Sequence, residues 1–166
     1  SEADKALTEA KSHGKHTAVF FDATMHERIL EEDNIVQTLH DACDHDGFRI
    51  VYQPQISTKT GKVIGFEALV RLKSGAYYPD RFIAPAEKYG MIIRIGRIVT
   101  AKVIHQMAVW RAQGVELQKI SINYSAKQLQ DEEYVQYLKS LLQKENISPD
   151  LIEIEVTESL YMEYKE

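Results

Sequence analysis

Hydrophobic residues recur with helical spacing over residues 25–44. The apolar positions are separated by four, seven, three and four residues and share one helix face: Met25, Ile29, Val36, Leu39 and Cys43. The pattern then changes to two strand-type segments, residues 48–55 and 63–72. The turn-forming residues 57–61 lie between them. The two segments are therefore predicted to form an antiparallel hairpin.

Beyond the hairpin, helix-type and strand-type patterns alternate. Helices are predicted over residues 81–89 and 92–113, and strands over 119–123 and 151–156. A further helix is predicted over residues 125–144, and its apolar side chains are expected to lie inside: Leu129, Val135, Leu138, Leu141 and Leu142. This alternation predicts an α/β fold whose parallel sheet is covered by helices.

The first 22 residues combine one helix-type segment, residues 3–11, with a short apolar strand, residues 17–21. One helix and one strand are too little to bury a core, so we expect them to belong to a preceding domain. The helix over residues 25–44 is then the natural linker between two domains. We also expect the chain to be an excerpt of a longer protein, because neither end carries a helix start or stop signal.

Composition restricts the class of protein. The 166 residues are 44% hydrophobic and 27% charged, as in a globular domain, and the net charge of −5 disfavours non-specific binding to nucleic acids. The single cysteine, Cys43, excludes an intramolecular disulfide and fits a reducing cytosol. No apolar run reaches the roughly 20 residues that span a bilayer. We therefore expect a cytoplasmic segment without membrane contact, although the whole protein can be anchored elsewhere.

One carboxylate stands out in the second predicted strand. Glu67 lies in a mostly apolar run, and Arg71 follows four residues later. A buried carboxylate is costly unless a positive charge compensates it. Taken alone, the strand favours a half-exposed position or an internal ion pair over a metal ion.

Two further strands end in oxygen-bearing side chains, and these make a metal ion a stronger explanation for Glu67. Asn123 closes one predicted strand, and Glu155 lies near the end of the next. The carboxyl ends of parallel strands point to one face of the fold, where active sites are built. With Glu67, this set suits Mg²⁺, Mn²⁺ or Ca²⁺, ions that serve phosphate-ester chemistry. The alternative is a polar cluster that only hydrogen-bonds neighbouring loops.

Five short motifs follow one another at suitable spacing, and as a set they are specific. They are Gln53-Pro54, Glu67-Ala68-Leu69-Val70-Arg71, Phe82-Ile83 with Ala86-Glu87, Ser121-Ile122-Asn123-Tyr124-Ser125 and Glu155-Val156-Thr157-Glu158-Ser159. Together they resemble the EAL domain, the family of cyclic-di-GMP phosphodiesterases. Residues 3–15 resemble the end of a GGDEF (diguanylate cyclase) domain, with Thr8 in place of the usual tyrosine.

The resemblance implies a modified TIM barrel with an antiparallel first strand, of which this chain is the N-terminal half. It divides the chain into a GGDEF remnant (1–22), a linker helix (23–46) and a truncated EAL-like domain (47–166). The implied reaction is hydrolysis of cyclic di-GMP to linear pGpG with two Mg²⁺ or Mn²⁺ ions, and Ca²⁺ is expected to inhibit.

The same resemblance assigns roles to single residues. Glu67, Asn123 and Glu155 match metal ligands, and Glu67 counts as catalytic, as does Glu158, which matches a glutamate that anchors a catalytic loop. The dinucleotide site is matched by Gln53, Leu69 and Arg71. A guanidinium suits a phosphate through its bidentate geometry, which gives Arg71 a physical reason to lie there.

A complete TIM barrel needs about 250 residues. Residues 47–166 are fewer, so we expect this segment to be inactive by itself and the intact parent to bind metal. Two alternatives stay open: a cyclic-di-GMP receptor without turnover, and a module that mainly mediates dimerisation. The expected partners are cyclic di-GMP and a second copy of the EAL-like domain, and not a nucleic-acid polymer.

Overall fold

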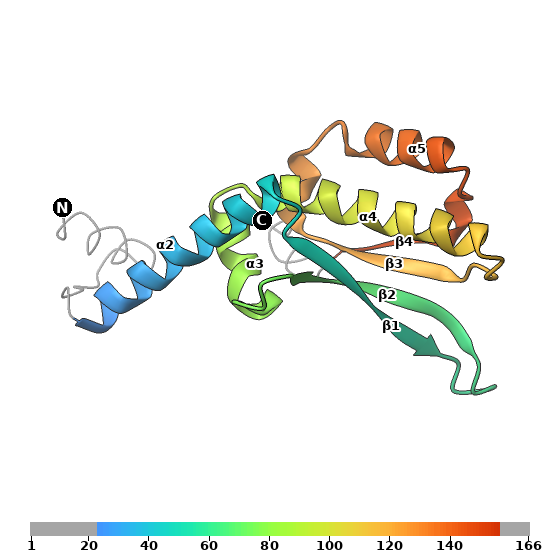
Figure 1. Cartoon of the computed structure of the whole chain (residues 1–166), viewed down its shortest axis with the longest axis horizontal. Helices are drawn as coiled ribbons and strands as arrows, with labels where there is room; N and C mark the ends of the chain where they lie inside the picture. The colour runs from blue at the N-terminus through green and yellow to red at the C-terminus, as the bar shows by residue number, and fades with distance from the viewer. Residues whose placement is uncertain (1–22, 157–166) are drawn as a thin grey trace, which may run out of the picture.

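The computed structural model describes residues 23–156. The elements in chain order are α2 (Ala23–Asp44), β1 (Phe48–Ile56), β2 (Val63–Leu72), α3 (Pro79–Lys88), α4 (Ile92–Ala112), β3 (Lys119–Tyr124), the 3-10 helix η1 (Ala126–Gln130), α5 (Tyr134–Glu145), the 3-10 helix η2 (Pro149–Leu151) and β4 (Ile152–Val156). Figure 1 shows α4 and α5 side by side along the strands, while α2 extends away from the sheet.

The four strands form one sheet in the order β1-β2-β3-β4. β1 and β2 are antiparallel: Ile56 pairs with Val63 beside the turn, and Phe48 pairs with Leu72 at the open end of the hairpin. The turn between them uses Gly61 at a φ of +67°, a conformation that favours glycine. β3 and β4 continue the sheet in parallel fashion. The predicted hairpin and the predicted parallel strands are both confirmed.

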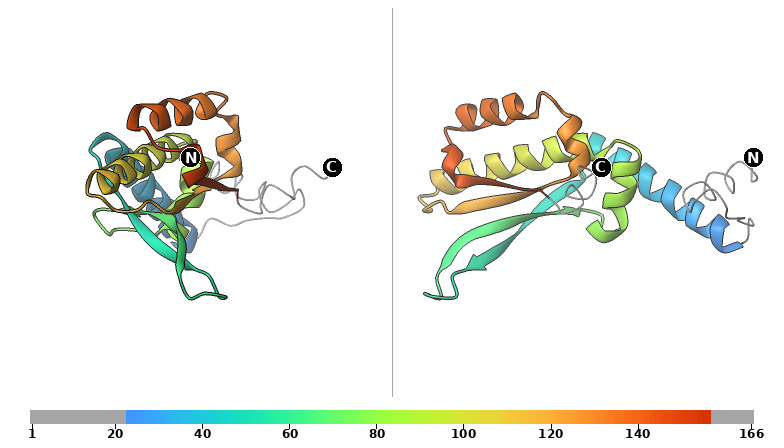
Figure 2. Two further views of the ribbon diagram at one scale, coloured as in Figure 1. Left: turned by 90° about the vertical axis from the view of Figure 1, so that its right-hand side faces the viewer. Right: turned by 180° about the vertical axis from the view of Figure 1, so that it is seen from behind.

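The hydrophobic core lies between the sheet and α4. The apolar stripe of α4 includes Ile95 and Val103, which meet Ile120 and Ile122 of β3 in one cluster of buried side chains. Figure 2 shows the same arrangement from the end and from behind: both α4 and α5 lie on one side of the curved sheet. The alternation of apolar residues along β3 therefore decides which face the helices cover.

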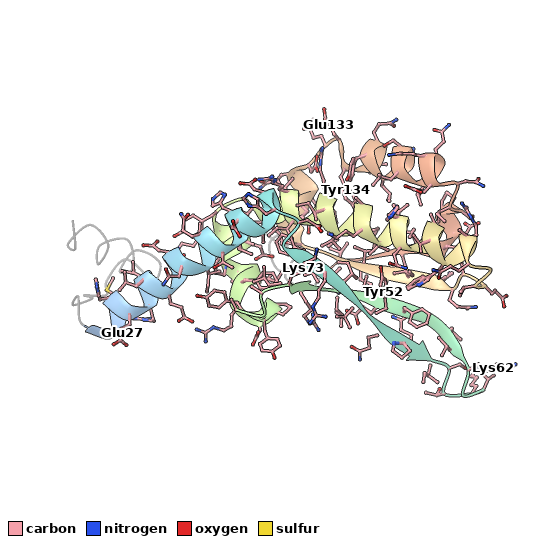
Figure 3. All side chains as sticks on the ribbon, in the orientation of Figure 1. Glu27, Tyr52, Lys62, Lys73, Glu133 and Tyr134 are labelled. Atoms are coloured by element: carbon pink, nitrogen blue, oxygen red, sulfur yellow. The ribbon has the colours of Figure 1, made fainter. Side chains whose placement is uncertain are left out.

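α5 is held against α4 by polar as well as apolar contacts. The hydroxyl of Tyr134, labelled in Figure 3, lies 2.9 Å from that of Thr100 in the buried layer between the two helices. The guanidinium of Arg97 donates to both carboxylate oxygens of Asp131, at 2.7 and 2.5 Å. These bonds fix the segment that follows β3 to the N-terminal half of α4.

The prediction of one continuous helix over residues 125–144 is wrong, because the segment forms two separate helices, η1 and α5. Ser125 caps the short helix η1 through a capping box with Gln128, and Asp131 then leaves helical geometry with ψ at 83°. α5 starts only at Tyr134. Leu129 and Val135, predicted to lie inside, are therefore 50% and 60% exposed. Of the other predicted positions, Leu142 is buried, and Leu138 and Leu141 pack against the core.

α2 packs on α3 and on the start of α4. Its buried apolar face includes Met25, Leu39 and Cys43, all members of the predicted stripe. Salt bridges join its exposed side to the next two helices: Glu31 to Arg81, Glu32 to Lys88 and Asp44 to Arg94. Burial raises the pKa of the Cys43 thiol. The predicted linker-type helix is thus a firmly attached part of the fold.

Candidate active site

The predicted site residues lie on the sheet face that points away from α4. Gln53 of β1 is the register partner of Glu67 of β2, and Asn123 of β3 is the partner of Glu155 of β4. Because registered residues share a face and side chains alternate along a strand, these four point to the same side. Leu69 and Arg71 follow Glu67 at positions +2 and +4, on that face.

Glu67 and Asn123 are in direct contact. The amide Nδ2 of Asn123 donates to Oε1 of Glu67 over 2.7 Å. The contact arises because Glu67 is in register with Ser121, so Asn123 stands two residues further toward the carboxyl end of the sheet. Glu67 forms no salt bridge with Arg71 anywhere in residues 23–156. The internal ion pair considered from the sequence is therefore absent.

Glu155 extends this pair into a row across three strands. It is half-buried on β4, opposite the exposed Asn123 of β3. Adjacent strands lie about 4.8 Å apart, so the two side chains are neighbours. Two carboxylates and an amide oxygen are the hard donors that divalent cations such as Mg²⁺ prefer. No cluster of three or more His, Cys, Asp or Glu side chains occurs within the described part of the chain, and here the middle donor is an amide.

The contact between Glu67 and Asn123 shows that their side chains lie close enough to share a divalent cation. Asn123 reaches Glu67 with its Nδ2, so the two polar heads already converge on one point. A cation placed between them needs Oδ1 instead. Rotation about the terminal torsion of asparagine, which is broad in energy, supplies it.

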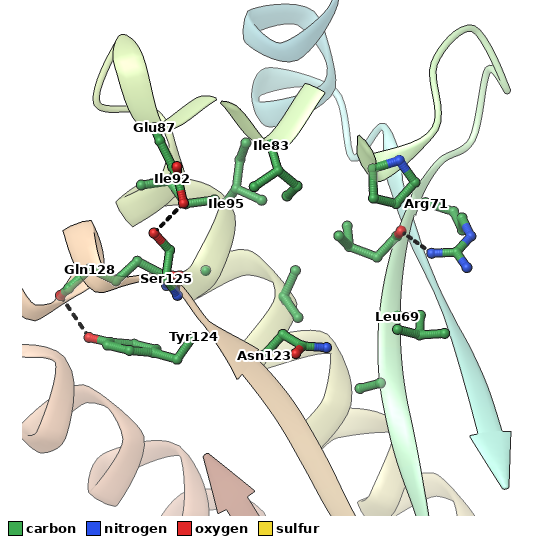
Figure 4. A pocket seen from close by; sticks show the side chains of 15 residues that line it. Leu69, Arg71, Ile83, Glu87, Ile92, Ile95, Asn123, Tyr124, Ser125 and Gln128 are labelled. Atoms are coloured by element: carbon green, nitrogen blue, oxygen red, sulfur yellow. Dashed lines mark hydrogen bonds between the residues drawn. The ribbon is translucent and has the colours of Figure 1, made fainter. Parts of the chain in front are cut away.

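A cavity of about 240 Å³ opens beside this row, between the ends of β2 and β3 and the helices α3, α4 and η1. Its floor is apolar, with Ile83, Ile92 and Ile95 (Figure 4). Its polar lining consists of Arg71, Glu87, Asn123, Ser125 and Gln128. Figure 4 shows Asn123 reaching from β3 toward β2 at the cavity edge. The cavity thus combines an apolar floor with the guanidinium of Arg71 and with Asn123, the one residue of the oxygen row that lines it.

Arg71 is partly held in place. One of its terminal nitrogens, Nη1, donates to the carbonyl oxygen of Val70 over 2.8 Å, as drawn in Figure 4. Its remaining N–H groups have no protein acceptor among the residues described. Leu69 also lines the cavity, whereas Gln53 is exposed on β1 and does not. Glu158 lies outside the described residues.

The sequence prediction assigned no role to three polar residues of the cavity. Ser125 donates its hydroxyl to Oε1 of Glu87 over 2.5 Å, and its backbone N–H donates to the side-chain oxygen of Gln128 over 2.9 Å. The sequence signal for the second contact is the Ser-x-x-Gln capping box. Nothing local in the sequence marks the first, because α3 and the end of β3 meet only in the folded chain.

The family model described as "EAL domain" matches residues 36–166. The chain belongs to the EAL domain family. Its match starts inside α2 and includes the whole sheet. The described residues contain no helix long and apolar enough to cross a membrane.

Among curated proteins, the cyclic di-GMP phosphodiesterase PdeR of Escherichia coli (strain K12) is 37% identical over 167 residues, which cover 99% of this chain and 25% of that protein. The signaling protein YkoW of Bacillus subtilis (strain 168) is 34% identical, covering 97% of this chain and 20% of that protein. The chain therefore spans a quarter or less of the length of these relatives.

Solved structures confirm the fold class. The PaMucR phosphodiesterase in its c-di-GMP complex superposes with a TM-score of 0.71 at 30% identity, covering 79% of this chain and 54% of that one. The FimX EAL domain of Xanthomonas citri in complex with c-diGMP gives a TM-score of 0.72 at 22% identity, covering 86% and 55%. The α/β architecture with an antiparallel first strand pair is that of the EAL domain, a TIM-barrel-like fold.

Proposed function

We propose that the whole protein to which this chain belongs is a metal-dependent phosphodiesterase that hydrolyses cyclic di-GMP to linear pGpG. The observation that carries the proposal is the convergence of Glu67 and Asn123 at 2.7 Å, with Glu155 next in the row, at the end of an EAL-type sheet. The printed activity of PdeR and the c-di-GMP complex of PaMucR support the substrate.

In this proposal Glu67, Asn123 and Glu155 hold Mg²⁺ or Mn²⁺ in a two-metal site, and Ca²⁺ occupies the same oxygens without supporting turnover. Cations held there would supply neutralisation of phosphate oxygens and a lowered pKa for an attacking water. The unused N–H groups of Arg71 orient a phosphate, which suits the planar donor fork of a guanidinium. Leu69 gives the dinucleotide an apolar contact, and Gln53 hydrogen-bonds it from β1. Glu158 is proposed to anchor a catalytic loop.

The domain assignment is also proposed. Residues 1–22 are the end of a GGDEF domain, 23–46 the linker helix and 47–166 part of the EAL domain. Support comes from MucR of Pseudomonas aeruginosa, named as a bifunctional diguanylate cyclase and cyclic di-GMP phosphodiesterase, whose match covers 96% of this chain. We further propose a cytoplasmic location. We also propose a homodimer formed through the EAL domain, and the molecular mass from light scattering tests this.

The test compares the whole protein with its Glu67→Ala variant. We expect Mg²⁺-dependent release of pGpG from cyclic di-GMP in the wild type and none in the variant. Glu132→Ala serves as the matched control, because Glu132 is an exposed glutamate between η1 and α5. Unchanged turnover in Glu67→Ala refutes the metal role.

The same assay separates the alternatives. Binding of cyclic di-GMP without pGpG in the wild type identifies a receptor. Residues 1–166 alone are expected to give no pGpG, since they span 54% of the PaMucR chain; turnover by this segment without a partner overturns that expectation.

A further inference from the structure

Glu87 is a half-buried carboxylate whose partner is a hydroxyl and not a cation. Its Oε1 accepts a hydrogen bond from Ser125 over 2.5 Å, and its side chain forms no salt bridge within residues 23–156. The neighbouring Lys127 reaches only its backbone oxygen, at 3.2 Å. Among residues 23–156, the Ser125 hydroxyl is therefore the one hydrogen-bond partner of the Glu87 carboxylate.

The residue it holds is the junction between β3 and η1. Ser125 is 7% exposed and follows Asn123 by two positions. Its backbone N–H and C=O are both bonded to Gln128, at 2.9 Å each. Its hydroxyl ties this junction to α3 across the cavity shown in Figure 4, and Lys127 of η1 adds a second bond to α3 at the Glu87 backbone oxygen. Glu87 thus completes the fixation of the carboxyl end of β3.

The side chain of Gln128 packs against Gly96 of α4, where any larger residue would collide with it. A Cβ on Gly96 of α4 would lie 1.8 Å from the side-chain nitrogen of Gln128. The chain end of β3 is therefore held from two sides, by α4 through Gln128 and by α3 through Glu87. Asn123 lies in β3, two residues before Ser125, so a release of Ser125 would allow the Asn123 amide to shift.

We propose that Glu87 is a positioning residue, which fixes Ser125 and thereby the direction in which Asn123 presents its amide to Glu67. The inference rests on the proposed function, because it assigns Glu87 to the same metal site. Outer-shell partners that orient ligands typically change metal affinity by about 10–100-fold when removed.

The experiment measures Mn²⁺ affinity of the whole protein by calorimetric titration without cyclic di-GMP. Glu87→Ala is expected to weaken binding by about tenfold or more. Glu87→Gln keeps an acceptor oxygen for the Ser125 hydroxyl and is expected to restore most of the affinity. Asp80→Ala is the control, since Asp80 is an exposed carboxylate on the same helix. Wild-type affinity in Glu87→Ala overturns the proposal.

A double-mutant cycle tests whether Glu87 acts on the metal site through Ser125. Ser125→Ala is expected to weaken Mn²⁺ binding at least as much as Glu87→Ala, because it removes the cap of η1 as well as the Glu87 contact. The double variant is expected to be no worse than Ser125→Ala, because the Glu87 contact is already lost in that variant. Additive losses would show that Glu87 acts on the site by another path and would overturn the assignment to Ser125.

A crystal structure of Glu87→Ala decides the point independently of metal and turnover. The Asn123 Nδ2–Glu67 Oε1 contact, 2.7 Å in the intact chain, is expected to be broken. Its retention overturns the positioning role. If the wild type neither binds Mn²⁺ nor releases pGpG, the proposed function fails, while the structure of the variant still tests what Glu87 holds.

Discussion

The two faces of the sheet are made by alternating residues of the same strands, yet they differ in kind. On β3, Ile120 and Ile122 face α4 and are each 1% exposed, while Asn123 between Ile122 and Tyr124 is exposed on the other side. The helix-covered face is closed by hydrophobic packing. The opposite face carries oxygen-bearing side chains, of which Glu67 and Asn123 are hydrogen-bonded to each other. A shift of one residue in register would exchange the two, so the packing of one face places the chemistry of the other.

The largest effect on stability is expected from a charge placed on the helix-covered face of the sheet. Ile122→Asp buries a carboxylate without a partner in the core, and we expect the whole protein to lose its fold. The neighbouring Asn123→Asp adds the same carboxylate to the exposed side and is expected to keep it. Circular dichroism melting curves compare the two variants. A wild-type melting curve for Ile122→Asp would mean that the covered face is not the core.

Removing the middle donor of the row is expected to affect function and not stability. Asn123→Ala should lower Mg²⁺-dependent hydrolysis of cyclic di-GMP by about 100-fold or more, beyond the usual effect of outer-shell partners. The melting temperature should stay close to that of the wild type. Gln136→Ala, which removes an exposed amide on α5, is the control for general effects of amide loss. Equal turnover in both variants would contradict a site on this face.

On the helix-covered side, Arg97 and Asp131 form an ion pair whose contribution to stability depends on pH. The guanidinium of Arg97 beside Asp131 lowers the pKa of that carboxyl, whose side chain is 7% exposed. Its contribution to stability is complete above the unfolded pKa of about 3.9 and is lost as the pH falls through the lower folded value. We expect the urea midpoint to fall between about pH 5 and pH 3. In Asp131→Asn the part of this pH-dependent loss of stability that comes from Asp131 should be absent. A urea midpoint with the same pH dependence as the wild type would contradict a stabilising Arg97–Asp131 pair.

The smallest effect concerns a polar atom on the oxygen-bearing face. The hydroxyl of Ser121 is buried, and no described residue accepts or donates a hydrogen bond to it. Removing an unsatisfied buried group is nearly neutral or stabilising. Ser121→Ala should therefore leave the free energy of unfolding unchanged or raise it by up to about 1 kcal/mol. A clear loss of stability, read from urea titration, would show that the hydroxyl has a partner.

The strands could be predicted from the sequence because their signals are local. The turn at residues 57–61 and the alternation over residues 119–123 specify the hairpin and the covered face without reference to the rest of the chain. The shared face of Glu67 and Asn123 followed from the same alternation. The prediction that Glu67 lies late in its strand was wrong, because β2 continues to Leu72 and Glu67 is in its middle. Their convergence is thus a consequence of the strand pattern, and the structure adds the 2.7 Å contact.

The errors lie where tertiary contacts override the local pattern. Leu129 and Val135 fit a helical period, but the capping box at Ser125 and the Arg97–Asp131 pair interrupt the helix between them. Glu87 and Ser125 each belong to one of the recognised motifs, but their contact could not be predicted, because the two residues are 38 positions apart in sequence. Side chains that connect two helices or a helix and a strand end cannot be assigned from periodicity.

The antiparallel first pair also has a consequence for the order of folding. β1 and β2 are joined by one short turn, so pairing Gln53 with Glu67 requires closure of a small loop only. Hairpins of this kind form in about 1–10 µs. Pairing of β2 with β3 closes a longer loop, which contains α3 and α4, and is therefore expected to be slower. The oxygen row is therefore assembled outward from Glu67, which reaches its place on a local hairpin before Asn123 arrives from a distant part of the chain.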